Sequence, residues 1–155
     1  MQRWIVIAVV GALLFGLGGG FALWTYRQNR PQQVWVPLAL NEELPEEKRE
    51  ELAAQIKEKL LEGTIIGDAV KETGLANKLK LSSDAEAEAE ARKRLFVVVG
   101  ETPTEMAGTV PSINVGFHCQ RKSYDAMGEM AKRVMRDVWK MLGIKAPEEK
   151  SGTTF

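Results

Sequence analysis

The chain has 155 residues, and its 21 lysine and arginine side chains balance its 21 aspartate and glutamate side chains. A net charge of zero leaves no basic excess to attract nucleic acid, so no nucleic-acid partner is expected. One cysteine and one histidine exclude an internal disulfide framework and a metal site that needs several such ligands.

An apolar run from Trp4 to Trp24 contains no charged side chain. As a helix rising about 1.5 Å per residue it is roughly 30 Å long, the thickness of a bilayer hydrocarbon core. We therefore expect residues 1–27 to form a single-pass transmembrane anchor in the cell (inner) membrane, with the following domain extracytoplasmic. The alternative is a signal peptide cleaved near Gly20–Ala22, which would release a secreted or periplasmic ligand-binding protein or hydrolase.

Small residues recur every four positions within this run, at Ala8, Ala12, Gly16 and Gly20. Small side chains at that spacing let two membrane helices approach closely. The pattern predicts a helix-packing face, and with it a homo-oligomer or a membrane-protein partner.

After a linker at residues 28–32, the sequence predicts a strand at Gln33–Leu40. Pro37 cannot donate to a ladder, so this strand is expected at an edge of the sheet or with a bulge. A helix follows from Pro45 and ends at Gly63. Its apolar stripe comprises Leu52, Ile56 and Leu60.

A second, short helix is predicted at Ile65–Thr73, with Gly74 as its end. Residues 75–81 are expected to link it to a third helix. Ser83 and Glu86 have the spacing of a capping box at the start of that third helix.

The third helix contains a Glu-Ala repeat with two favourably spaced ion pairs, Glu88–Arg92 and Glu90–Arg94. Because alanine has little side chain to bury, we expect this helix to lie on the surface.

Leu95–Val99 is a continuous apolar run, which predicts a central strand covered on both faces. A loop is expected at residues 100–111. Ser112–Gln120 alternates apolar and polar residues, which predicts a half-buried strand. Its inner face consists of Ile113, Val115, Phe117 and Cys119.

The longest amphipathic helix is predicted at Tyr124–Leu142, between Ser123 and Gly143. Its apolar stripe comprises Met127, Met130, Ala131, Val134, Val138, Met141 and Leu142. The order of elements predicts an α+β fold, in which an N-terminal transmembrane helix is followed by a small three-stranded sheet packed with helices. We assign this extracytoplasmic domain to residues 33–143 and expect a disordered tail at residues 144–155.

His118 and Cys119 are the strongest candidates for catalytic side chains, but neighbouring strand residues point to opposite faces. They therefore cannot form a nucleophile–base pair, and Cys119 is expected in the core. No catalytic residue, cofactor or metal ligand is predicted, and the chain is not expected to be an enzyme.

A basic stripe on the long helix offers a different function, through Lys132, Arg133, Arg136 and Lys140. Such a stripe can meet an anionic lipid or a phosphate-linked glycan carrier at a membrane surface. The alternative is an ordinary solvated face whose charge is balanced by Asp125, Glu129 and Asp137.

Three segments carry a family resemblance: Val34–Leu40, Ile66–Leu75, and Ser112–Cys119 followed by Tyr124–Ala126 and Glu129–Ala131. Together they resemble the membrane-proximal domain of the polysaccharide chain-length determinant (Wzz-type) family. The chain differs from that family in lacking a second apolar span and a long helical extension. The resemblance implies a membrane-anchored, non-enzymatic assembly domain linked to polysaccharide biosynthesis and export.

Overall fold

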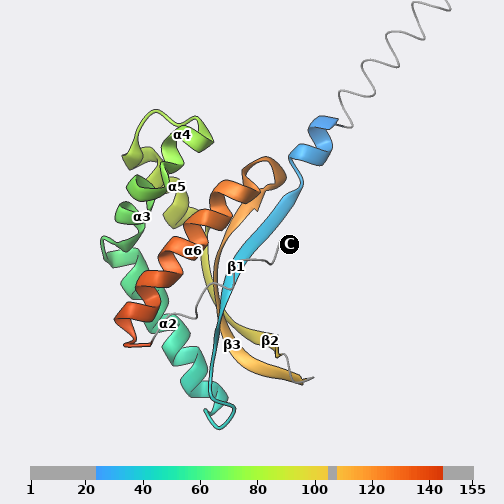
Figure 1. Cartoon of the computed structure of the whole chain (residues 1–155), viewed down its shortest axis with the longest axis vertical. Helices are drawn as coiled ribbons and strands as arrows, with labels where there is room; N and C mark the ends of the chain where they lie inside the picture. The colour runs from blue at the N-terminus through green and yellow to red at the C-terminus, as the bar shows by residue number, and fades with distance from the viewer. Residues whose placement is uncertain (1–23, 105–107, 145–155) are drawn as a thin grey trace, which may run out of the picture.

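The computed structural model describes residues 24–104 and 108–144. Its elements in chain order are β1 (Pro31–Ala39), α2 (Glu46–Glu62), α3 (Ile65–Thr73), α4 (Leu75–Leu79), α5 (Asp84–Arg94), β2 (Leu95–Thr104), β3 (Gly108–Gln120), a 3-10 turn at Arg121–Ser123, and α6 (Tyr124–Met141). The strands form one antiparallel sheet in the order β1-β3-β2. Helices α2 to α6 all lie on one side of this sheet (Figure 1). The fold is therefore α+β with two layers, as expected for its sheet and helices.

The predicted fold class is wrong in one part, its transmembrane helix. Among residues 24–104 and 108–144, no helix is long and apolar enough to cross a membrane. Even α6, with 18 residues, carries charged side chains along one side, since it packs on the sheet with its other side only. The predicted helix-packing residues lie outside the described residues: Ala8, Ala12, Gly16 and Gly20.

The position of β1 confirms the prediction that the strand containing Pro37 lies at an edge of the sheet, because β1 pairs with β3 alone. The strand begins at Pro31, two residues earlier than predicted.

The prediction that Leu95–Val99 forms a central strand covered on both faces is wrong. The central strand is β3, and β2 is the second edge. Leu95 and Val97 are buried against the helices, whereas Val98 points the other way and is 46% exposed. The residues on the outer side of this run are therefore apolar too, although no element of the described chain covers that side.

The predicted loop at residues 100–111 is also wrong over most of its length. The β2–β3 register continues to the pair Thr104 and Gly108, so most of these residues extend the two strands of a hairpin. Threonine favours strands, and at an edge strand a proline such as Pro103 is tolerated.

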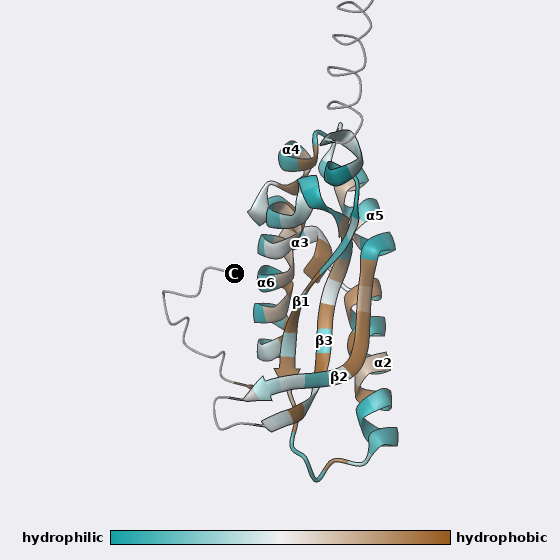
Figure 2. Cartoon of the chain, turned by 90° about the vertical axis from the view of Figure 1, so that its right-hand side faces the viewer, coloured by the Kyte–Doolittle hydropathy of each residue, from teal (hydrophilic) through white to brown (hydrophobic). Residues whose placement is uncertain are grey.

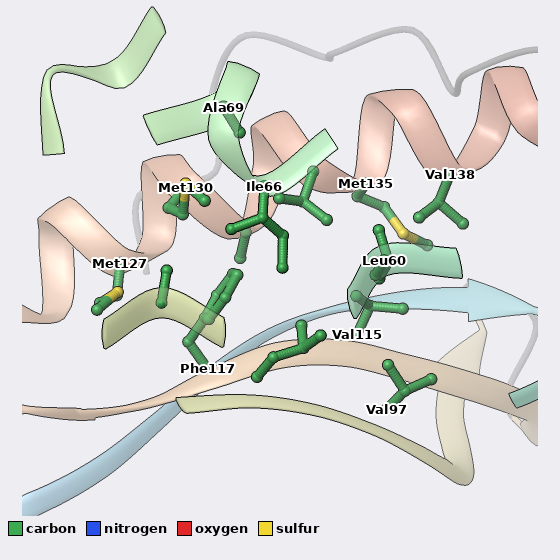
Figure 3. Packing of buried hydrophobic residues seen from close by; sticks show 14 of the residues in the cluster. Leu60, Ile66, Ala69, Val97, Val115, Phe117, Met127, Met130, Met135 and Val138 are labelled. Atoms are coloured by element: carbon green, nitrogen blue, oxygen red, sulfur yellow. The ribbon is translucent and has the colours of Figure 1, made fainter. Parts of the chain in front are cut away.

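The core lies between the sheet and the helices. Phe117 and Val115 point from β3 toward Ile66 of α3 and toward the methionines of α6 (Figure 3). Helix α6 contacts β1 and β3, while α2 covers β2. The predicted stripe of α6 is buried at Met127, Met130, Ala131, Val134 and Val138, and Met135 joins it.

Helix α5 lies on the surface as expected, with its outer side exposed, but Ala87 and Ala91 on its inner side are fully buried. A small side chain is useful there because it allows a close approach to α3. At Gly67 of α3, an added Cβ would lie 2.9 Å from a carboxylate oxygen of Glu88. The two inner alanines therefore serve close helix packing.

Arg92 of α5 connects this helix to the end of α2. Its guanidinium donates to the carbonyl oxygens of Leu61 and Gly63, the latter at 2.9 Å, and to Glu88 at 2.7 Å. Both predicted ion pairs of α5 are confirmed, Glu88–Arg92 and Glu90–Arg94.

The capping box predicted before α5 is confirmed in one half only. The Ser83 hydroxyl accepts from the Glu86 N–H at 3.2 Å. The Glu86 carboxylate, however, accepts from the hydroxyl and the N–H of Ser82, at 2.6 and 2.9 Å. The preceding stretch, predicted as a linker, contains the short helix α4 between left-handed residues Gly74 and Lys80.

Candidate functional site

Among residues 24–104 and 108–144, no helix lies over the side of the sheet that faces away from α2 to α6. Figure 2 looks onto this side, with the three strands in front of the helices. Strand alternation and the register assign to it Gln33, Trp35, Pro37 and Ala39 of β1, Ser112, Asn114, Gly116 and His118 of β3, and Phe96, Val98 and Gly100 of β2. We call these eleven residues the open face.

The open face carries no aspartate, glutamate, lysine or arginine. Charged residues make up 27% of the chain, so a solvent-facing surface across three strands would ordinarily include several. Instead, Trp35 is 49% exposed and Val98 is 46% exposed. The strands thus present aromatic and aliphatic groups to solvent where charges are usual.

Gly116 lies at the middle of this face, opposite Trp35 on one side and Phe96 on the other. A Cβ at Gly116 would lie 2.6 Å from the Trp35 Cβ and still closer to the carbonyl oxygen of Val34. Real Cβ atoms do not approach backbone so closely, so only glycine allows β1 to lie this near β3.

His118 is the one titratable residue of the open face. Its Nδ1 accepts a hydrogen bond from the side-chain amide of Gln33 at 3.3 Å. Its ring also contacts Phe96, with centroids 4.8 Å apart and planes tilted by 46°.

Cys119 points to the opposite side, into the core, and is 6% exposed. Burial raises the pKa of the Cys119 thiol, with the charge of Arg94 opposing the shift. The prediction that His118 and Cys119 face opposite ways is confirmed, and these two side chains therefore form no catalytic pair.

A hollow open to solvent lies where β1 begins, lined in part by Gln33, Trp35, His118 and Tyr124. Its lining residues include no carboxylate, lysine or arginine. Across residues 24–104 and 108–144, no group of three or more His, Cys, Asp or Glu side chains is placed to hold a metal ion. The hollow adds a concave end to the open face, and its lining residues also include Cys119, which is 6% exposed.

The predicted basic stripe lies on α6, at Lys132, Arg133, Arg136 and Lys140. Arg133 is paired with Glu72 of α3 and with Asp137, and its side chain is 14% exposed. Arg136 lies 3.7 Å from Glu72, and Lys140 lies 3.6 Å from Asp137. Two carboxylates, Glu72 and Asp137, therefore lie near three of the four cations and balance only part of their charge, and Lys132, Arg136 and Lys140 are exposed. Binding of an anionic partner at this stripe stays a prediction.

The open face was not predicted from the sequence, although a signal for it existed. The continuous apolar run of β2 predicts a strand with two covered faces. The alternation in β3 predicts one covered face only. These two patterns agree if the outer side of β2 is apolar and no element among the described residues covers it.

Comparisons of the chain with protein-family models, with curated proteins and with solved structures find no match in any of the three. The resemblance to the chain-length determinant family therefore stays a prediction.

Proposed function

We propose that this chain is a non-enzymatic assembly domain, and that its open face binds a protein whose own contact surface is uncharged and apolar. The observation that carries the proposal is the absence of charge from a solvent-facing sheet on which Trp35 and Val98 stand about half exposed. Centres of protein interfaces are depleted of charge and enriched in aromatic side chains in the same way.

The sequence pattern of β2 supports this proposal. Strands that are covered on both faces are continuously apolar, and β2 has this composition at Leu95–Val99. The helices cover the inner face of β2. A partner that covers its outer face would explain why the strand is apolar on both faces. Exposed apolar side chains that gather on one face, such as Trp35 and Val98 here, often mark an interaction site.

The arrangement of the two reactive side chains supports a role without catalysis. A thiol with a raised pKa is a poor nucleophile, because the thiolate is the reactive form. Nothing on the open face could activate it, since His118 points away from it.

The resemblance to the chain-length determinant family favours a place for this assembly role in polysaccharide biosynthesis and export. Neighbouring genes for glycosyltransferases or flippases would support that part of the proposal. If the neighbouring genes instead consistently serve an unrelated process, the link to polysaccharide export fails and the binding role is unaffected.

The binding role is tested by photocrosslinking in cells that produce the full chain. A benzoylphenylalanine at position 98 should yield a discrete crosslinked protein that mass spectrometry identifies. The matched control is position 61, where Leu61 is 37% exposed on the helical side. Addition of Asn114→Lys should weaken the product at position 98, because a charge is placed on the surface that the partner covers. Equal products at both positions, or none at position 98, would contradict the proposal.

A further inference from the structure

We propose that the partner of the open face is a second copy of this chain, packed sheet against sheet about a two-fold axis. This inference rests on the proposed function and names the occupant of the same surface. Two α+β layers joined in this way form a four-layer α/β/β/α dimer in which each sheet is covered on both sides.

Charge favours a second copy as the occupant. In an isologous dimer each surface meets itself, so any cluster of like charges would repel its own copy. The open face carries no charged residue, and the whole chain has a net charge of zero. A surface of one sign would instead indicate a partner of opposite sign, and the open face has none to offer.

The exposed side chains of the face also suit a copy of itself. Trp35 is 49% exposed on β1, whereas its neighbour Gly116 is buried. A two-fold axis near the centre of the face brings the exposed Trp35 and Val98 of each copy against the apolar face of the other. Stacked sheets pack about 10 Å apart, with side chains from the two faces interdigitating in this manner.

The size of the face is that of a small, weak interface. Three strands spaced about 4.8 Å apart, with β1 nine residues long, give a surface of roughly 14 by 30 Å. Two such surfaces bury roughly 900 Å² as flat areas, at the low end for specific complexes. We therefore expect a reversible dimer with a dissociation constant in the micromolar range.

The edges of the sheet offer a competing mode, and the two edges differ. The β1 edge carries Pro31 and Pro37, which oppose the addition of another strand. The β2 edge has no proline or charge between Leu95 and Gly100. Pairing of two β2 edges is therefore the alternative mode that the experiment must separate from face packing.

The test uses the full chain, purified in a mild nonionic detergent because of its apolar N-terminal run. Asn114→Cys places a thiol near the centre of the open face, and a bis-maleimide with a span of about 8 Å should join two copies across sheets about 10 Å apart. Lys57→Cys on α2 is the matched control and should give no dimer. In edge pairing the two β3 strands would be separated by roughly 14 Å, beyond the reach of this reagent. Native Cys119 is buried and should give no product.

Sedimentation velocity supplies the second measurement. Val98→Lys should weaken the dimer by roughly tenfold or more, because an unpaired ammonium would be buried in an apolar interface. Leu61→Lys, an equally large change on the helical side, should leave the dimer unchanged.

Four results would overturn the proposal: a monomer at about 100 µM, well above the expected dissociation constant, a dimer that is insensitive to Val98→Lys, a dimer without an Asn114→Cys product, or crosslinking through Lys57→Cys. If the purified chain is monomeric while position 98 still captures a different protein in cells, the second-copy inference fails and the proposed function stands. If position 98 captures nothing in cells, the proposed function itself fails.

Discussion

Gly116→Ala should destabilise the domain, although it adds only one methyl group. The new Cβ would lie 2.6 Å from the Trp35 Cβ and 2.8 Å from the Trp35 Cα, and still closer to the Val34 carbonyl oxygen. Two of these three atoms belong to the backbone of β1, so no rotamer change can relieve the contact. The strands must separate at the centre of the sheet instead.

The magnitude follows from two opposing effects. Overpacking of this kind costs about 1–3 kcal/mol. Loss of glycine's freedom in the unfolded chain returns about 0.4–1 kcal/mol. Because two of the three contacts are to backbone, the cost should lie in the upper half of its range, so the net loss in the free energy of unfolding is about 1–2.5 kcal/mol, which lowers the melting temperature by roughly 4–10 °C for a domain of this size.

The assay is thermal and urea unfolding of the full chain, monitored by circular dichroism. The protein concentration is kept below the dissociation constant of the proposed dimer. Gly128→Ala in α6 is the control, because its added Cβ would lie 3.6 Å from a methyl group of Val34, an ordinary contact. That substitution should stabilise the protein by about 0.5–1 kcal/mol, since alanine is the better helix former. A Gly116→Ala protein as stable as the wild type would refute the close approach of β1 and β3 on which this reasoning depends.

Three further predictions concern the rest of the domain. Arg92→Met should lower the free energy of unfolding by about 1–3 kcal/mol in urea titrations, because main-chain carbonyls and a carboxylate lose their donor. Arg94→Met removes an ion pair within α5 only and should cost under about 0.5 kcal/mol, so equal losses would contradict the linking role of Arg92. Burial raises the pKa of the Cys119 thiol, so native protein should react with a maleimide at pH 8 at least about tenfold more slowly than urea-unfolded protein, and equal rates would place the thiol in solvent. Hydrogen bonds from the Ser82 hydroxyl and N–H lower the pKa of Glu86, so its contribution to stability is complete above the ordinary glutamate pKa and is lost as the pH falls through the lowered value. In an NMR titration Ser82→Ala should raise the Glu86 pKa toward its ordinary value, and an unchanged curve would show that these bonds are not its cause.

Local sequence determined most of the helices and located all three strands of this protein. Helix α3 begins and ends at the predicted residues, Ile65 and Thr73, because Gly74 in the left-handed conformation stops it there. The alternation in β3 correctly placed Phe117 and Cys119 in the core. These features depend on neighbours within one or two turns or on strand alternation, so a single segment contains the information that specifies them.

The arrangement of these elements depended on contacts between distant segments. Whether β2 or β3 is the central strand depends on which strand pairs on two sides, and no segment alone records that pairing. The burial of Ala87 depends on the close approach of α3. The ion pair of Arg133 with Glu72 likewise depends on α3, which carries Glu72.

The open face belongs to this second kind of feature. The sequence shows that the residues of β2 are apolar, and this follows from composition alone. Only the tertiary structure shows that the helices cover one side of the sheet and leave Trp35 and Val98 on the other. A hydrophobic pattern records how much surface a strand can bury, whereas the packing of the whole chain decides which part of that surface remains uncovered.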